Sequence, residues 1–90
     1  MYPQLILHLI ESCEEAARAG ICREEIRNRL LPEKVARLLA NLPARDFMEW
    51  VRLDPDYCYY YQELQQTGIS PAPAEAVAMI LEAIALDALD

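Results

Sequence analysis

The chain has 90 residues, of which 54% are hydrophobic, and carries a formal net charge of −7. A chain of this length suits one domain and buries only about 60–65% of the surface that it exposes when unfolded, so self-association would add stability. The apolar content excludes a disordered acidic tail, and the presence of only two glycines argues against a sheet with many tight turns. We therefore expect residues 1–90 to form a single all-α domain, a compact bundle of about five to six short helices.

The first helix is bounded by Pro3, which suits a first helical turn, and by Gly20, which suits the residue after a helix end. Between them, apolar residues recur at helical spacing and define one inward face. The residues of that face are Ile6, Leu9, Ile10, Cys13 and Ala17.

Residues 21–42 should form two short helices that separate at Pro32. Proline disfavours helix at the residue before it and suits the first position of a new helix. The inward residues are Ile26, Leu30 and Leu31 on the first of the two, and Val35, Leu38, Leu39 and Leu42 on the second, which should span residues 33–42.

Two further helices follow Pro43 and Pro55. The fourth has an apolar side made by Phe47, Met48, Trp50 and Val51. Asp54 is a good cap and Pro55 a good first-turn residue, so the fifth helix should run from about residue 55 to residue 67 and stop at Gly68.

The fifth helix carries a run of tyrosines. At helical spacing, the residues that share its inward face are Tyr57, Tyr60, Tyr61 and Leu64. Tyr59 lies far round the helix, so it should be exposed or contact a partner. The run is either a set of core-edge residues with hydroxyls in water or an interface, because tyrosine is typical of interface hot spots. The interface residues would be Tyr59, Gln62, Glu63 and Gln66.

The last helix has more apolar surface than one buried face needs. Ser70 can cap it and Pro71 suits its first turn. Its apolar stripe comprises Val77, Ile80, Leu81, Ile84 and Ala88, and the apolar residues off that stripe are Met79, Leu86 and Leu89. We expect this helix to be the central helix of the bundle or the seam of a homodimer.

Charge is distributed unevenly along the chain. All eight basic residues lie in residues 18–52 with five acidic ones, whereas residues 53–90 contain seven acidic residues and no Lys or Arg. Such an acidic end can dock on a basic surface or stand in for nucleic-acid phosphates, or it can simply keep a small apolar domain in solution. Glu82 and Asp87 of the last helix are the candidate contacts there.

The basic segment offers an alternative, a helix-turn-helix over residues 20–42. Its candidate contacts to nucleic acid are Arg23, Arg27, Lys34, Arg37 and Asn41. This motif normally has a turn of about three to four residues, often with Gly, and the junction at Pro32 is shorter and lacks Gly. Basic residues also have acidic neighbours four positions before them, in the pairs Glu14–Arg18, Glu25–Arg29 and Glu33–Arg37.

Catalytic and metal-binding patterns are weak. The one histidine, His8, and the three cysteines, Cys13, Cys22 and Cys58, match the ligand count of a zinc site but lack its close C-x-x-C spacing. His8 and Cys13 lie about 140° apart around a helix, so they form no local thiol–imidazole pair. The chain also lacks a glycine-rich phosphate loop, a nucleophile elbow and an H-E-x-x-H stretch. We expect no catalytic residue, metal, cofactor or small-molecule substrate.

No apolar run reaches the roughly 18 residues of a membrane span, and the apolar residues 5–10 are too short for a signal peptide. The odd number of cysteines is typical of reduced thiols, so we expect a cytoplasmic protein that is not bound to a membrane.

Two functions fit this chain. The first is a small acidic, non-enzymatic protein-binding module that acts as a regulator, adaptor or inhibitor of a larger protein or complex, of the kind that phages and mobile elements encode. Its partner is a protein, and a homodimer is a further assembly. The second is a dimeric helix-turn-helix DNA-binding transcriptional regulator that uses residues 18–52.

Overall fold

The computed structural model describes residues 2–90, which contain helices and no strand. In chain order the elements are α1 (Tyr2–Arg18), α2 (Arg23–Glu25), the π-helical segment η1 (Ile26–Leu30), α3 (Leu31–Leu39), α4 (Ala44–Leu53), α5 (Cys58–Gln66) and α6 (Pro73–Leu89). The prediction of an all-α bundle is confirmed.

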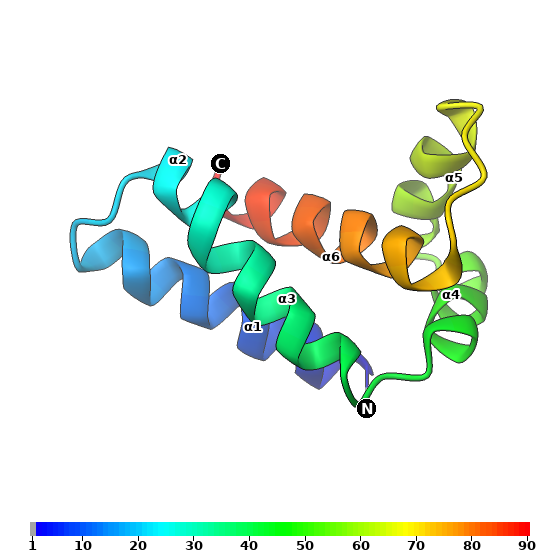
Figure 1. The fold of residues 1–90 in the computed structure, drawn as a ribbon, viewed down its shortest axis with the longest axis horizontal. Coiled ribbons are helices and arrows are strands. Elements are labelled where there is room, and N and C mark those ends of the chain that lie inside the picture. Colours follow the sequence, from blue (N-terminus) through cyan, green and yellow to red (C-terminus); the bar gives the residue numbers. More distant parts are fainter. Residues whose placement is uncertain (1) are drawn as a thin grey trace.

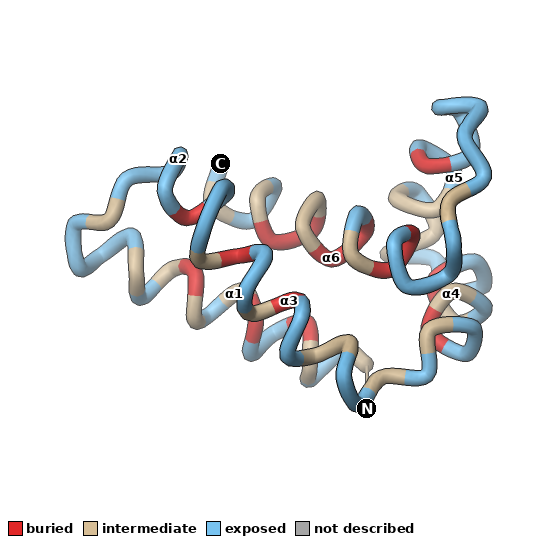
Figure 2. Tube along the Cα trace, in the orientation of Figure 1, coloured by how far each residue is buried: buried red, intermediate tan, exposed pale blue. Residues whose placement is uncertain are grey.

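α6 is the helix around which the others pack. It crosses the molecule with α1 and α3 along one part of its length and α4 and α5 near the other end, and it contacts all four (Figure 1). Figure 2 shows that buried positions recur along it. Its buried residues are Ala76, Val77, Ile80, Leu81, Ile84 and Ala85. The prediction of a central helix is therefore confirmed.

Two alanines that we assigned to buried faces are exposed, so those assignments are wrong. Ala17 in the last turns of α1 and Ala88 at the end of α6 line one shallow hollow between the two helix ends. Helical spacing placed both residues on apolar stripes, but both lie near helix ends, where fewer neighbouring side chains are present to cover a small methyl group. The inward residues Ile6, Leu9 and Cys13 of α1 are buried as predicted.

Residues 23–39 follow one helical path, so the predicted break at Pro32 is wrong. The path changes from α to π geometry in η1, where the backbone N–H of Leu31 donates to the carbonyl of Ile26. Pro32 has no N–H, and in a regular α-helix its ring would press on the carbonyl of Asn28. The wider π-helical turn before Pro32 relieves that clash without ending the helix.

Glycine and proline set the other boundaries. Gly20 (φ 96°) and Gly68 (φ 73°) adopt left-handed backbone conformations just after α1 and α5, as predicted. α6 begins at Pro73 and not at Pro71, because a proline holds the residue before it in an extended conformation, here Ala72 at ψ 151°.

α5 also begins later than predicted. The side chain of Asp54 accepts a hydrogen bond from the backbone N–H of Asp56 (2.8 Å), which closes a turn over Pro55. Regular helix starts only at Cys58.

The buried residues form one connected cluster, and the Cα radius of gyration is 12.7 Å. A globular chain of this length has a radius of about 12 Å, so the bundle is compact. No helix within residues 2–90 combines the length and the hydropathy needed to cross a membrane.

Candidate functional site

A groove between α5 and α6 is the most distinctive surface feature of the molecule. It encloses about 270 Å³. Its lining residues are Tyr59, Tyr60, Glu63, Leu64 and Thr67 from α5, and Met79, Ile80, Ala83 and Asp87 from α6. Leu64 and Ile80 are buried and belong to the core, so the floor of the groove is the outer surface of the helix–helix contact.

Apolar side chains that reach solvent converge on this groove. The large hydrophobic residues that are exposed within residues 2–90 are Leu7, Leu53, Tyr59, Ile69 and Met79. Two of them, Tyr59 (54% exposed) and Met79 (42% exposed), lie in the same groove on different helices. Single exposed apolar residues are ordinary on protein surfaces, but two that share one concavity favour a binding site.

Tyr59 is the end of a chain of aromatic contacts. Its ring meets that of Tyr60 edge-on at 5.1 Å, and the contacts continue to Tyr57 (6.5 Å) and then to Trp50 (5.2 Å). Trp50 in turn contacts Tyr2 of α1. These edge-on and tilted arrangements are the favourable ones for aromatic pairs. The rim of the groove is thus supported by aromatic rings from α4 and α1.

The groove has a negative electrostatic field. Burial, followed by the Asp87 carboxylate, raises the pKa of Tyr60 to about 12. The Glu63 carboxylate is the largest cause that raises the pKa of Tyr59, and Asp87 adds to it. Both phenols therefore stay protonated at neutral pH, and each lies against a carboxylate of the groove, Tyr59 against Glu63 and Tyr60 against Asp87. None of the residues that line the groove is Lys or Arg.

The structure brings together half of the predicted interface residues. Tyr59, Glu63 and Asp87 line the groove. Gln62 and Gln66 are exposed and lie beside Tyr59 on the outer side of α5, at helical positions beyond the groove wall. Glu82 is half-buried and does not line the groove; its burial raises the pKa of its carboxyl.

Met79 lines the groove but was not predicted as a site residue from the sequence. The available signal was its place off the apolar stripe of the last helix, which left it without a predicted contact. Thr67 and Ala83 gave no signal, because only the packing of α5 on α6 places them at the groove.

The residues proposed for nucleic-acid contact have varied surroundings. Arg23 pairs with Asp90 (2.9 Å) and Arg37 with Glu33 (2.8 Å), while the Arg27 guanidinium donates to the side chain of Asn28. Lys34 lines a hollow together with Arg37 and His8, and Asn41 is exposed after α3.

Of the three predicted i,i+4 pairs, two are present as ion pairs, Glu25–Arg29 (3.2 Å) and Glu33–Arg37. Glu14 and Arg18, both in the described part of the chain, form none. The continuous helical path over residues 23–39 also lacks the turn that a helix-turn-helix places between its helices.

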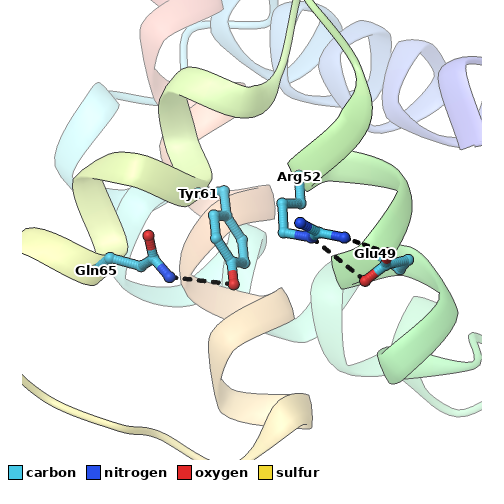
Figure 3. Close-up of polar contacts among 4 residues, drawn as sticks. All are labelled: Glu49, Arg52, Tyr61 and Gln65. Carbon is cyan, nitrogen blue, oxygen red and sulfur yellow. Dashed lines mark hydrogen bonds and ion pairs between the residues drawn. The ribbon is translucent and has the colours of Figure 1, made fainter.

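A second hollow lies on the other side of α5, against α4 and the start of α6, and encloses about 240 Å³. Four polar residues in or beside this hollow form two separate contacts (Figure 3). Arg52 donates to the carboxylate of Glu49 through both Nε and Nη2, and the Gln65 amide donates to the Tyr61 hydroxyl at 3.2 Å. Arg52 lowers the pKa of Glu49, mainly through this hydrogen bond.

Within residues 2–90, no three His, Cys, Asp or Glu side chains are placed to hold a metal ion together. Cys13, Cys22 and Cys58 are free thiols. Cys13 is buried in the core, and burial raises the pKa of its thiol, which makes it a poor nucleophile.

Comparisons with protein-family models, with curated proteins and with solved structures give no match for this chain.

Proposed function

We propose that the chain is a non-enzymatic protein-binding module that acts as a regulator, adaptor or inhibitor by occupying a surface of a larger protein or complex. The observation that carries this proposal is the convergence of Tyr59 and Met79 on the α5–α6 groove. Tyrosine is enriched at interface hot spots, and methionine adapts its shape to different partners.

The size of the groove favours a macromolecular partner over a small-molecule substrate. Pockets for small molecules usually have volumes of about 300–1,000 Å³ and bury most of the ligand. The α5–α6 groove, at about 270 Å³, is smaller and suits an anchoring side chain of a larger partner. Its walls supply phenol donors, carboxylates and apolar surface.

The proposal places this module in the cytoplasm, because three free thiols, one of them on the exposed residue Cys22, fit a reducing compartment. It also includes a homodimer as an assembly of the module. The seam of such a dimer is not the apolar stripe of α6, since α1, α3, α4 and α5 already cover it. Sedimentation at increasing protein concentration tests this assembly.

The test of the proposed function is affinity capture of the tagged chain from a lysate of its host, with and without nuclease, followed by mass spectrometry. The captured protein is then titrated with the Tyr59→Ala variant. Tyr61→Ala is the matched control, because Tyr61 lies on the same helix but faces the second hollow. We expect a nuclease-resistant partner whose affinity falls more than about tenfold with Tyr59→Ala and stays within about twofold with Tyr61→Ala.

The alternative function, a DNA-binding regulator, is tested in the same experiment by the double variant Lys34→Glu, Arg37→Glu. If binding disappears with nuclease or with this double change while Tyr59→Ala has no effect, the module proposal is wrong. The basic face of α3 would then be the binding surface.

A further inference from the structure

We infer that the occupant of the α5–α6 groove is a basic amphipathic segment of the partner, with an apolar side chain against Met79 and Lys or Arg side chains facing Glu63 and Asp87. This inference rests on the proposed function and specifies the chemistry of the partner. It follows from the charges, the exposed aromatic ring and the shape of the groove.

Unbalanced negative charge is the first argument. Glu63 on α5 and Asp87 on α6 form no ion pair with any residue of the described chain. Both walls of the groove come from residues 53–90, which contain no Lys or Arg. Glu33 pairs with Arg37 and Glu49 with Arg52, whereas no Lys or Arg lines the groove beside the two carboxylates there. The carboxylates of the groove can therefore pair with cations from another molecule.

The second argument is the ring of Tyr59. The ring is more than half exposed, and its neighbours in the groove include the Glu63 carboxylate. A Lys or Arg side chain can lie over the face of a tyrosine and reach a nearby carboxylate at the same time. The two interactions favour the same kind of partner side chain.

The third argument is the apolar surface beside the carboxylates. Met79, Ala83 and Asp87 follow one another along α6 at intervals of four residues, and Glu63 lines the groove from α5. A partner that carries only positive charge would leave Met79 in water. An amphipathic segment, which has apolar side chains on one stripe and cations on its flanks, buries Met79 and pairs both carboxylates.

A second copy of this chain is a poorer occupant. Two grooves placed face to face would bring together Glu63 and Asp87 from both copies, and like charges in direct opposition weaken an interface. If the groove received the basic face of another copy, the contact would join different surfaces of the two copies. Such head-to-tail contacts build open filaments unless the rotation between successive copies closes them into a ring.

The probe for the experiment is a synthetic helical peptide that has a stripe of leucines along one face and lysines on both sides of that stripe. Two matched peptides have glutamates in place of the lysines or serines in place of the leucines. Binding is followed by the NMR signals of methyl-labelled methionines in the full chain. Met79 reports on the groove, and Met48, which lines the second hollow, is an internal control.

We expect the leucine–lysine peptide to shift the Met79 signal and leave the Met48 signal in place, while the two matched peptides bind at least about tenfold more weakly. The double variant Glu63→Gln, Asp87→Asn should weaken the leucine–lysine peptide about tenfold. The double variant Glu11→Gln, Glu15→Gln removes the same charge from the exposed side of α1 and should change affinity less than about twofold.

Three results would overturn the inference. The first is a shift at Met48, or at neither methionine, when the peptide is added. The second is an equal loss of affinity in the two double variants, since the attraction would then be a general effect of net charge. The third is a shift at Met79 that follows protein concentration without peptide, which would identify a second copy as the occupant.

The inference and the proposed function can fail separately. If the captured partner loses affinity with Tyr59→Ala but not with Glu63→Gln, Asp87→Asn, the groove is the interface and its partner is not basic. If the partner is insensitive to Tyr59→Ala, the proposed function fails as well.

Discussion

The two hollows beside α5 have similar volumes but differ in charge: the charged side chains that line the α5–α6 groove are all carboxylates, whereas the hollow against α4 is also lined by arginine. The hollow against α4 is lined by one carboxylate, that of Glu49, and by two arginines, Arg45 and Arg52, and the Glu49 carboxylate is paired with Arg52 (Figure 3). The α5–α6 groove contains Glu63 and Asp87 without a cation. A groove whose carboxylates have no cation beside them and lie near exposed apolar groups gains from a basic, apolar partner, whereas a hollow whose one carboxylate is already paired with an arginine gains nothing from such a partner's cations.

One short helix presents both hollows. Tyr59 and Glu63 are four residues apart and share one side of α5, and Tyr61 and Gln65 share another. The two sides are offset by two residues, which is about 200° around an α-helix. The run of tyrosines therefore divides into an exposed residue, Tyr59, which we propose as an interface residue, and residues that hold α5 against its neighbours.

The largest expected effect on stability comes from removing the contact that Leu64 makes between α5 and α6. Leu64 is 8% exposed and packs between α5 and α6. Leu64→Ala should lower the free energy of unfolding by about 2–4 kcal/mol, because it removes buried apolar surface and leaves a cavity. Urea denaturation measures this change, and Gln65→Ala is the control on the same helix. A loss below about 1 kcal/mol would mean that α5 is not fixed by α6 and that the groove has no stable shape.

A smaller effect should follow Tyr59→Ala. Tyr59 is 54% exposed and its ring contacts that of Tyr60, so the melting temperature should fall by no more than about 4 °C. Differential scanning calorimetry of Tyr59→Ala and Tyr61→Ala compares the two sides of α5 directly. A much larger fall for Tyr59→Ala would show that its ring supports the core and does not serve as a free anchor.

The fold could be predicted from the sequence where helical spacing and end signals agree. Gly20 and Gly68 allowed two helix ends to be placed, and the apolar excess of residues 74–89 identified the central helix. The path through Pro32 could not be predicted, because a proline ends, bends or widens a helix according to what the following residues bury. Here Leu31 and Val35 on either side of it are buried, which stabilises the continuous helix.

The site could be predicted only in part. The spacing of the tyrosines indicated that Tyr59 points outward and that its neighbours point inward. Nothing in the spacing indicated that Asp87, 28 positions after Tyr59, would line the same groove, because that depends on how α5 crosses α6. The same tertiary geometry leaves Glu82, five residues before Asp87, out of the groove.

The ion pair of the second hollow should matter little for binding. Arg52 and Glu49 are exposed, so their attraction is weakened by solvent and salt. Because Arg52 lowers the pKa of Glu49, the pair stabilises the fold at neutral pH and loses that effect as pH falls through the folded-state pKa. Glu49→Gln should lower the melting temperature at pH 7 by less than about 2 °C and leave partner affinity unchanged. A clear loss of affinity would place the partner on this side of α5 and reverse the comparison.

The smallest expected effect has the opposite sign and concerns Glu82. Burial raises the pKa of the Glu82 carboxyl in the folded chain above its value in the unfolded chain. Between these two pKa values the folded chain binds more protons than the unfolded chain, so the fold loses stability as the pH rises through this range. Glu82→Gln should therefore stabilise the fold at pH 7 by a few tenths of a kcal/mol, a small gain because solvent reaches this half-exposed side chain.

Thermal unfolding at pH 7 and at pH 4 tests the change at Glu82, with Glu75→Gln in the exposed first turn of α6 as the control. The control should be slightly destabilising, since a carboxylate near a helix N-terminus is favourable. The gain from Glu82→Gln should shrink at pH 4, where the native carboxyl is itself largely protonated. Partner affinity should not change, because Glu82 lies outside the groove. A loss of affinity without a gain in stability would extend the interface from Tyr59 across the outer face of α6.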